Sequence, residues 1–396
     1  MTEKKDLTKE TRILHAGEKV DLPISYPEAL PIYQTSAFVL RDLDTIRTAH
    51  QIPQGGYYYS RGGNPNQDGL AAALAAAEDG PAAAVCSSGM AAILAGILAV
   101  VQAGDHIIAA DAIYGGTYGL LKSDLAKLGI STSFVDLNDP AAIKNALRPE
   151  TKLFVTEIAT NPFVKIIDID SVVAIAHAAG AKVLVDNTFT TPCHINPLQR
   201  GVDIVVHSAT KFINGHNDVI AGAVIASPGI VIAAKHVIAS FGTVISPFDA
   251  WLVLRGIKTM SLRVAKQSAN ALAVATALAK HPKVAQVFYP GLPDNPYHEL
   301  ATRLLRGGYG AMLSFYIPDD RDKVNKFMQT LAVIKFVTTL GGVRTTLSHP
   351  ATTSHADLEP DLQKKMGIHN GLLRLSIGIE DAADLIADLY TALDAV

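Results

Sequence analysis

The chain has 396 residues, of which 49% are hydrophobic and 18% are charged, and its formal net charge is −3 at pH 7. This length and composition can bury the core of one large or two medium domains, which excludes an intrinsically disordered protein. The near-neutral balance and the absence of any Lys/Arg run exclude an electrostatic footprint for nucleic acid.

The two cysteines and the N-terminal residues indicate the cellular compartment. The two cysteines, Cys86 and Cys193, form no C-x-x-C pair, so the sequence predicts neither a zinc site nor a disulfide framework. The N-terminal stretch is polar and lacks the apolar segment of a signal peptide. The longest apolar run, residues 90–101, is too short to span a bilayer. We therefore expect a cytoplasmic protein in a reducing setting.

Residues 1–60 read as an irregular N-terminal arm. They are dense in proline, and a glycine- and tyrosine-rich stretch follows. A globular domain seldom begins with so long a loop unless the loop packs on another surface. The pattern changes at Asn64, a predicted N-cap with Pro65 at the first helical position, and an alanine-rich helix is expected to run to Gly80.

Short apolar runs then alternate with helical stretches. Near-continuous apolar strands joined by helices are typical of a mostly parallel α/β sheet that is covered on both faces. The expected helices span residues 90–102, 116–128 and 168–179, and the expected strands span residues 82–86, 106–110, 132–136, 153–158, 181–186, 203–206 and 221–227.

A second, smaller sheet is expected after a long helical stretch over residues 246–278, within which we expect a break. Its predicted strands are residues 311–317, 332–338 and 372–378, and helices over 319–331 and 381–395 would cover it. We place the domain boundary near residue 255. The chain then divides into an arm (1–60), a first α/β domain (61–255) and a C-terminal domain (256–396).

Polar residues follow several of these strands. In open parallel sheets, ligands bind at the carboxyl ends of the strands. Each residue also has a plain structural interpretation, since Ser-Ser-Gly is a common connector, an aspartate often caps a helix, and a lysine often lies on a surface loop. The residues concerned are Gly89 and Met90 at a helix start, and Asn161, Asp186, Ser208, Thr210 and Lys211 at strand ends.

Taken together, these residues match the requirements of pyridoxal 5′-phosphate (PLP). A lysine forms a Schiff base with its aldehyde, a carboxylate keeps its pyridine nitrogen protonated, and a helix N-terminus with hydroxyl groups holds its phosphate. Partial burial at a strand end depresses the pKa of a lysine, which suits Lys211 to this role. The motifs GxGxxG, GxxxxGK[ST], HExxH and GxSxG are absent, which disfavours dinucleotide, nucleotide, zinc-protease and serine-hydrolase sites.

The chain resembles the Cys/Met-metabolism family of PLP enzymes. Eight motifs follow the family's order over nearly the whole chain, among them YYYSRGGNPN, SSGMAAI, VDNTFTTP, HSATKFINGHNDV and LGGVRTTLSHPA. The resemblance implies the aminotransferase-like fold of PLP enzymes (fold type I). It also implies a homotetramer of two dimers, an amino-acid substrate, and active sites shared across each dimer interface.

The resemblance assigns a role to each site residue. Lys211 would form the Schiff base and shuttle protons, and Asp186 would pair with the pyridinium. Tyr114 would stack on the ring and assist the leaving group, and Arg374 would clamp the substrate's α-carboxylate. The remaining cofactor contacts would be Gly89, Met90, Ser208 and Thr210 to the phosphate, Asn161 to the ring hydroxyl, and Tyr59 and Arg61 to the phosphate of the neighbouring subunit.

Four positions depart from familiar members of the family. Gly116 stands where methionine γ-lyases carry cysteine, and Arg344 stands where cystathionine-handling members carry glutamate. Thr339 replaces a usual serine, and Asn66 replaces a usual threonine. We expect γ-elimination on an L-amino acid with a leaving group at Cγ, of the methionine, homocysteine or O-substituted homoserine type, with canavanine included. γ-Replacement is the close alternative, and a non-catalytic binding protein on this fold is a remote one.

Overall fold

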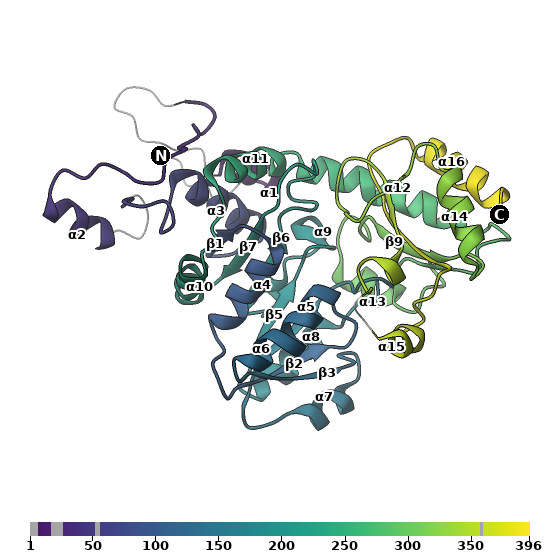
Figure 1. The fold of residues 1–396 in the computed structure, drawn as a ribbon, viewed down its shortest axis with the longest axis horizontal. Helices are drawn as coiled ribbons and strands as arrows, with labels where there is room; N and C mark the ends of the chain where they lie inside the picture. The colour runs from purple at the N-terminus through teal and green to yellow at the C-terminus, as the bar shows by residue number, and fades with distance from the viewer. Residues whose placement is uncertain (1–6, 17–26, 52–55, 357–358) are drawn as a thin grey trace.

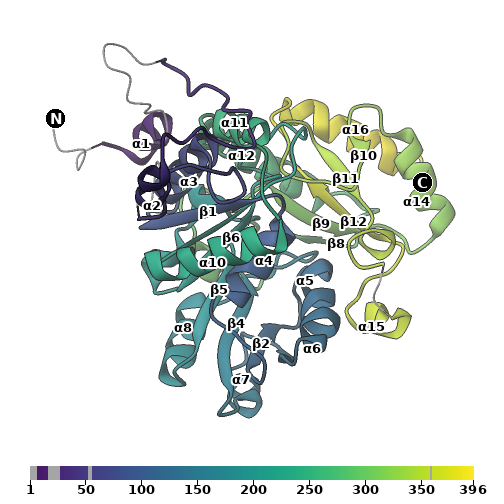
Figure 2. The ribbon, with the colours of Figure 1, turned by 60° about the vertical axis from the view of Figure 1, so that its left-hand side comes forward.

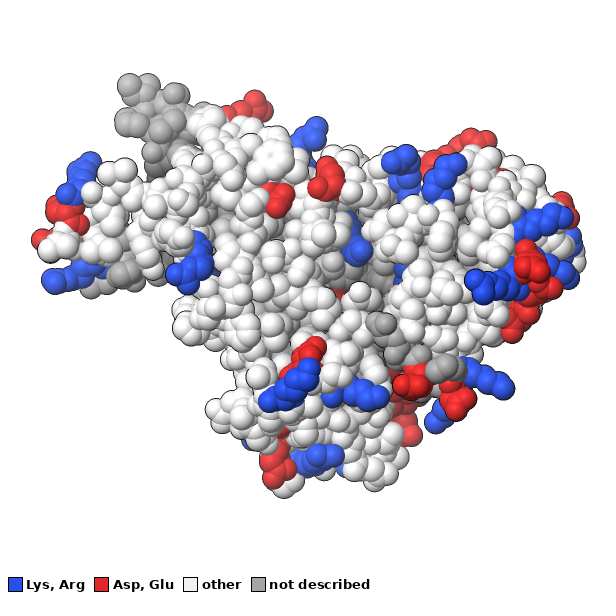
Figure 3. All heavy atoms as spheres, in the orientation of Figure 1, with Lys and Arg blue, Asp and Glu red and all other residues white. Residues whose placement is uncertain are grey.

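The structure is a computed structural model, and it describes residues 7–16, 27–51, 56–356 and 359–396. Two packed sheets organise the chain, a larger one in the middle and a smaller one near the C-terminus (Figure 1). Within the described residues, no helix has the length and apolar character needed to cross a membrane. On the face drawn in Figure 3, Lys and Arg side chains lie close to Asp and Glu side chains at several places around the periphery.

The described part of the N-terminal segment contains two helices, α1 (Lys9–His15) and α2 (Leu43–Gln51). The prediction of an irregular segment is therefore wrong for these stretches. Thr8 caps α1 with its side chain, and Arg12 of α1 forms an ion pair with Asp79 at 2.7 Å. Both helices are short, and contacts with the rest of the chain, which the local pattern does not reveal, stabilise α1. In Figure 1, α2 lies at the left margin, away from the sheets.

The larger sheet has seven strands in the order β1-β7-β6-β5-β4-β2-β3. β7 runs antiparallel to both of its neighbours, and the remaining pairs are parallel, which confirms a mostly parallel α/β sheet. All seven predicted strands are present within about two residues of their expected ends. Their bounds are β1 Ala82–Cys86, β2 His106–Ala110, β3 Ser131–Val135, β4 Thr151–Glu157, β5 Lys182–Asp186, β6 Ile204–Ser208 and β7 Gly222–Ala226.

The helices around this sheet follow the predicted signals closely. Asn64 accepts a hydrogen bond from the N–H of Asn66, which caps α3 (Pro65–Ala77), and α3 ends before the expected Gly80. The stretch expected as one helix over 116–128 contains a π-helical segment between two α-helical ones. The other helices here are α4 Gly89–Leu98, α5 Gly115–Gly119, the π-segment Leu120–Asp124, α6 Leu125–Lys127, α7 Pro140–Ala146, α8 Ile169–Ala178, α9 Thr191–His194 and α10 Pro228–Phe241.

The predicted break in the long helical stretch is confirmed. Pro247–Ile257 forms α11 and Met260–Leu278 forms α12, which leads from the larger sheet to the smaller one (Figure 1). The side chain of Ser246 accepts a hydrogen bond from the N–H of Asp249, which caps the N-terminus of α11. The expected domain boundary near residue 255 falls inside α11.

The smaller sheet has five strands in the order β10-β11-β12-β9-β8. β8 (Gln286–Phe288) and β11 (Thr346–Ser348) were not expected, and the predicted strand over 332–338 shrinks to β10 (Lys335–Phe336). Strands of two or three residues are too short for a period-two pattern to be recognised. The remaining elements are β9 Met312–Tyr316, β12 Leu372–Ser376, α13 His298–Leu304, α14 Arg321–Thr330, α15 Pro360–Lys365 and α16 Ala382–Asp394.

Candidate active site

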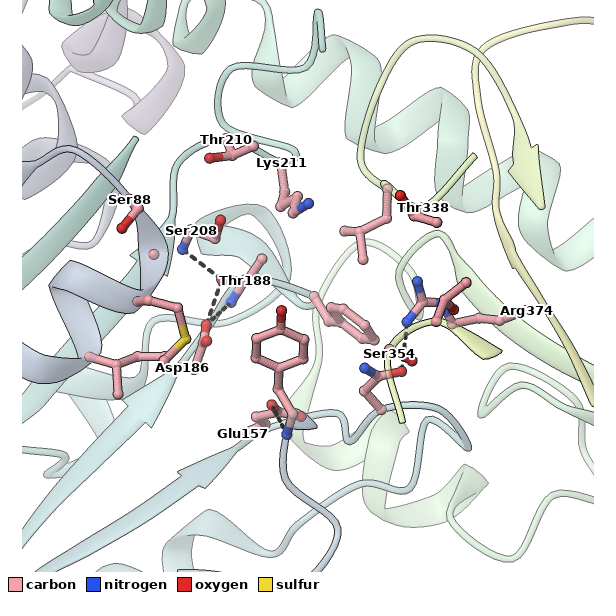
Figure 4. Close-up of a pocket in the computed structure, with 18 of the residues that line it drawn as sticks. Ser88, Glu157, Asp186, Thr188, Ser208, Thr210, Lys211, Thr338, Ser354 and Arg374 are labelled. Carbon is pink, nitrogen blue, oxygen red and sulfur yellow. Dashed lines mark hydrogen bonds between the residues drawn. The ribbon is translucent and has the colours of Figure 1, made fainter. Parts of the chain in front are cut away.

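A cavity of about 520 Å³ lies between the carboxyl ends of β4, β5 and β6, the N-terminus of α4, and β12 of the smaller sheet. Figure 4 shows polar side chains from both sheets pointing into it. Its wall contains most of the site residues expected from the sequence. Those are Gly89, Met90, Tyr114, Asn161, Asp186, Ser208, Thr210, Lys211 and Arg374.

Lys211 lies three residues beyond the end of β6, and its ammonium group projects into the cavity (Figure 4). The loop that carries it is held by backbone hydrogen bonds from Lys211 N–H to Ser208 C=O (3.1 Å) and from Gly215 N–H to Lys211 C=O (2.7 Å). Nζ lies 3.4 Å from the hydroxyl of Thr339. Burial, and next the nearby Arg374, lower the pKa of Lys211, so the neutral nucleophilic amine is more accessible than on a surface lysine.

Asp186 ends β5 and is partly buried on the floor of the cavity. Its Oδ1 accepts hydrogen bonds from the N–H (2.9 Å) and the hydroxyl (2.5 Å) of Thr188. Burial raises the pKa of Asp186, and the Thr188 hydrogen bonds oppose that rise by favouring the carboxylate. Thr188 also accepts a hydrogen bond from the N–H of Ser208 at 2.9 Å, which connects the ends of β5 and β6.

The N-terminus of α4 meets the end of β6 at close range. Ser88 caps the helix by accepting a hydrogen bond from Ala91 N–H at 3.1 Å. A Cβ added at Gly89 would lie 2.7 Å from Cβ of Ser208, so only glycine permits this approach. The first N–H groups of the helix have no intrahelical acceptor and carry the positive end of the helix dipole. The hydroxyl of Thr210 accepts a hydrogen bond from Ala221 N–H at 2.9 Å, which fixes it on the same side.

These residues fit PLP. The helix N-terminus with the Ser208 and Thr210 hydroxyls suits a phosphate, because its free N–H groups and dipole favour an anion. The Asp186 carboxylate suits a protonated ring nitrogen, and the lowered pKa of Lys211 suits capture of an aldehyde.

The opposite wall comes from the smaller sheet. Arg374 lies on β12 and is buried, and its Nη1 donates to Oδ1 of Asn161 at 2.7 Å. Its Nε is buried and has no hydrogen-bond partner among the described residues. Burial lowers the pKa of Arg374 to about 10, yet the group stays cationic near neutral pH. A planar cation with a free donor suits a carboxylate ligand.

Five expected site residues do not line this cavity. Tyr59 and Arg61 lie on the surface, with the Arg61 guanidinium 5.7 Å from the centre of the Tyr59 ring. A Cβ at Gly116 would lie 2.6 Å from the ring of Tyr114, so Gly116 lies behind that ring. Thr339 and Arg344 line an adjoining cavity of about 660 Å³.

Asn66, the fourth departure from the family pattern, has a structural role. It accepts a hydrogen bond from Tyr33 N–H at 2.7 Å and donates one to Pro31 C=O at 2.8 Å, which ties the N-terminal segment to α3. It does not line the cavity.

Sequence reasoning missed several residues of the cavity wall. A hydroxyl residue two positions after an aspartate is typical of an Asx turn, so Thr188 had a recognisable signal. Glu157, the last residue of β4, had the same strand-end position as Asp186. Side chains from the loops of the smaller sheet had no local signal. The missed residues include Ser88, Glu157, Thr188, Phe189, Ile220, Thr338, Leu340 and Ser354.

Comparison with known proteins extends over the whole length. A family model for the Cys/Met metabolism PLP-dependent enzyme matches residues 10–394. An L-methionine gamma-lyase of Porphyromonas gingivalis is 41% identical over 371 residues, 93% of each chain. A cystathionine gamma-lyase of Bacillus subtilis is 38% identical over 391 residues, 98% of this chain and all of the relative. The structure of a putative O-acetylhomoserine (thiol)-lyase of Campylobacter jejuni, with a pyridoxyl-lysine phosphate, has a TM-score of 0.93 at 30% identity, covering 98% of this chain and 100% of that chain.

The aligned regions cover every residue that lines the cavity and both sheets. This likeness confirms the fold class, the PLP dependence and the enzymatic nature expected from the sequence. The homologues of this chain support elimination or replacement at the γ-carbon of an amino acid, and a cystathionine beta-lyase of Lactococcus lactis is also 40% identical over 97% of this chain. The chain belongs to the Cys/Met metabolism family of PLP-dependent enzymes.

Proposed function

We propose that this protein is a γ-lyase for an L-amino acid whose γ-substituent is neutral or anionic. One observation carries the proposal. The cavity that holds Lys211, Asp186 and Arg374 adjoins a second cavity whose rim carries Arg344. Thr210, Lys211 and Ile220 line both cavities, so a substrate held by Arg374 can extend its γ-substituent toward Arg344.

Each residue then has a task in the reaction. When bound, PLP supplies an acceptor for the electron pair left at Cα. Arg374 binds the α-carboxylate through its free donor, which orients the Cα–H bond. Lys211, in its neutral form, takes the proton from Cα, and its lowered pKa makes that form available. Tyr114 assists proton transfer to the departing γ-substituent.

The distal end of the substrate meets positive charge. Arg344 is exposed, and its guanidinium has no hydrogen-bond or ion-pair partner among the described residues. Lys335 lines the same cavity, as does Asp218, so the two cations outnumber the one carboxylate there. A distal ammonium, as in cystathionine, is disfavoured there by like-charge repulsion. Methionine, homocysteine and O-acylhomoserines are favoured, and canavanine fits when its oxyguanidine binds neutral.

A substrate panel tests this proposal. Each candidate is incubated with the holoenzyme, and 2-oxobutanoate, pyruvate and the released group are measured. 2-Oxobutanoate reports γ-elimination, whereas pyruvate reports β-elimination. A new thioether formed with an added thiol, in place of 2-oxobutanoate, would favour the alternative of γ-replacement. Bleaching of the visible absorption by borohydride checks that the cofactor is bound through Lys211.

The assembly and location complete the proposal. We place this protein in the cytoplasm as a homotetramer of two dimers. Tyr59 and Arg61 reach the phosphate site of the neighbouring subunit, which explains why they lie exposed and outside the cavity of their own chain. The proposed domains are the arm (1–60), the PLP-binding domain (61–255) and the C-terminal domain (256–396). In support, the larger sheet ends at Ala226, and the smaller sheet begins at Gln286.

A further inference from the structure

Two carboxyl groups lie side by side on the floor of the cavity. Glu157 ends β4, Asp186 ends β5, and the two residues are register partners in this parallel pair. Neighbouring strands lie ~4.8 Å apart, and register partners project from the same face. Both residues line the cavity, and both are labelled in Figure 4. Glu157 is buried and Asp186 is partly buried, and the pair shares one wall of the cavity.

The two carboxyl groups accept different numbers of hydrogen bonds. Asp186 Oδ1 accepts two hydrogen bonds from Thr188. Glu157 Oε1 accepts one, from Tyr114 N–H at 2.9 Å, and Glu157 Oε2 is buried with no partner among the described residues. A buried carboxylate oxygen without a donor is costly, whereas a protonated one becomes a donor facing the cavity.

Burial and the charge of the nearest carboxylate also favour the protonated form of Glu157. The titratable groups that face Glu157 are Asp186 on β5, Tyr114 in the loop before α5, and Arg374 on β12. Burial and next the charge of Asp186 raise the pKa of Glu157 to about 8, and the backbone N–H groups of Tyr114 and Asn161, followed by the charge of Arg374, oppose that rise. Paired acids whose environments differ in this way divide into one that is charged and one that is neutral.

The contact with Tyr114 gives Glu157 a mechanical role as well. Tyr114 is the N-cap of α5, and its side chain makes no capping hydrogen bond. α5 has the sequence GGTYG, and glycine is a poor helix former, so this turn has little intrinsic stability. Besides the Tyr118 N–H to Tyr114 C=O hydrogen bond of this turn (2.9 Å), the hydrogen bond to Glu157 is a tether that fixes the backbone of Tyr114.

We propose that Glu157 is a positioning residue that keeps its proton at working pH. It holds Tyr114 in place through Oε1, donates a hydrogen bond into the cavity through Oε2, and leaves Asp186 as the carboxylate charge of the pair. As the pH rises through about 8, Glu157 ionises. The donor is then lost, and a second negative charge appears beside Asp186. Activity is therefore expected to fall on the alkaline side.

The test compares three variants as holoenzymes. Glu157→Gln keeps an acceptor for Tyr114 and a donor to the cavity but cannot ionise. Glu157→Met has similar length and neither hydrogen bond. Glu150→Gln, at an exposed position, controls for removing a carboxylate. Infrared spectra should show the carbonyl stretch of a protonated carboxylic acid at pH 7. That band should disappear as the pH rises through about 8, and it should be missing in Glu157→Gln but present in Glu150→Gln.

Kinetics form the second arm, and this arm alone rests on the proposed function. Glu157→Gln should stay within about 3-fold of the wild-type kcat at pH 7 and lose the alkaline decline near pH 8. Glu157→Met should lose about 10-fold or more at every pH, because Tyr114 loses its tether. An absent infrared band, an unchanged alkaline decline in Glu157→Gln, or equal damage in Gln and Met would each overturn the proposal. The infrared result stands whichever substrate is turned over, so a wrong substrate assignment is distinguishable.

Discussion

The floor of the cavity and the rim of the adjoining cavity differ in how firmly their side chains are held. On the floor, Asp186 is fixed by two hydrogen bonds from Thr188, and Thr188 is fixed by Ser208. At the rim, Arg344 is exposed without a partner among the described residues, and Ile220 is 67% exposed. The floor can be changed only by disturbing neighbouring strands, whereas the rim can change residue by residue. We therefore expect the floor to determine the reaction chemistry and the rim to determine the choice of substrate.

The difference also concerns the medium in which charges act. Charges on the floor interact through protein of low effective dielectric, whereas rim charges interact through water and are screened by salt. Substitutions on the floor should therefore have large effects that do not depend on ionic strength. Substitutions at the rim should have small effects that do.

The largest effect is expected for Lys211→Ala. The variant should fold, since Lys211 lies in a loop and the strands are untouched. It should lack the borohydride-sensitive absorption band and lose turnover by about 10³-fold or more, because its side chain is both the attachment point and the base. Absorption before and after borohydride, with turnover of the best substrate of the panel, checks both statements. Robust turnover would contradict the assignment of Lys211.

Asp186→Asn should have the next largest effect. The amide can still accept the hydrogen bonds of Thr188, so the loop geometry should persist. It cannot hold the pyridine nitrogen protonated, and removing a preorganised charge partner costs about 10²-fold or more in kcat. Cofactor content should stay high because the phosphate contacts are intact. An unchanged kcat would mean that Asp186 is only a turn residue.

Arg61→Ala tests a third region, the exposed segment that directly follows the arm. Loss of a charge-assisted hydrogen bond to phosphate should weaken PLP binding by about 10- to 100-fold, measured by titrating apoenzyme. If Arg61 serves the neighbouring subunit, mixing this variant with Lys211→Ala creates hybrid dimers that have one intact site. Random pairing would then restore about a quarter of the wild-type activity. No restoration, after subunit exchange is demonstrated, would contradict the shared site.

Sequence patterns predicted the floor far better than the rim. Asp186, Ser208 and Lys211 follow apolar strands, and the carboxyl ends of parallel strands meet at one edge, so their meeting followed from topology. Thr339 and Arg344 lie in loops between strands of two or three residues, where no periodicity exists to place them.

The sequence did not predict the helices of the N-terminal segment or the importance of Glu157, and the reasons differ from those at the rim. α1 is held by tertiary contacts such as Arg12 with Asp79, which local propensity does not encode. Glu157 followed an apolar run like Asp186 did, but its importance depends on the register of β4 with β5 and on the partner of each oxygen. Neither quantity can be read from a single strand.

The smallest effect is expected for Arg344→Glu, and it tests the rim directly. If Arg344 faces the distal end of the substrate, reversing its charge should raise kcat/KM for cystathionine relative to a neutral substrate. Exposed charge pairs contribute up to about 1 kcal/mol, so each charge step corresponds to about 5-fold. Arg344→Gln should therefore give about half of the change in kcat/KM on a logarithmic scale.

The gain in Arg344→Glu should shrink in high salt, because exposed charges are screened, whereas the loss in Asp186→Asn should not. Lys335→Glu, in the same cavity, should shift the ranking in the same direction but by less, because the Lys335 ammonium donates to Ala332 C=O at 2.6 Å. The same ranking of substrates in Arg344→Glu and wild type would remove Arg344 from the substrate site.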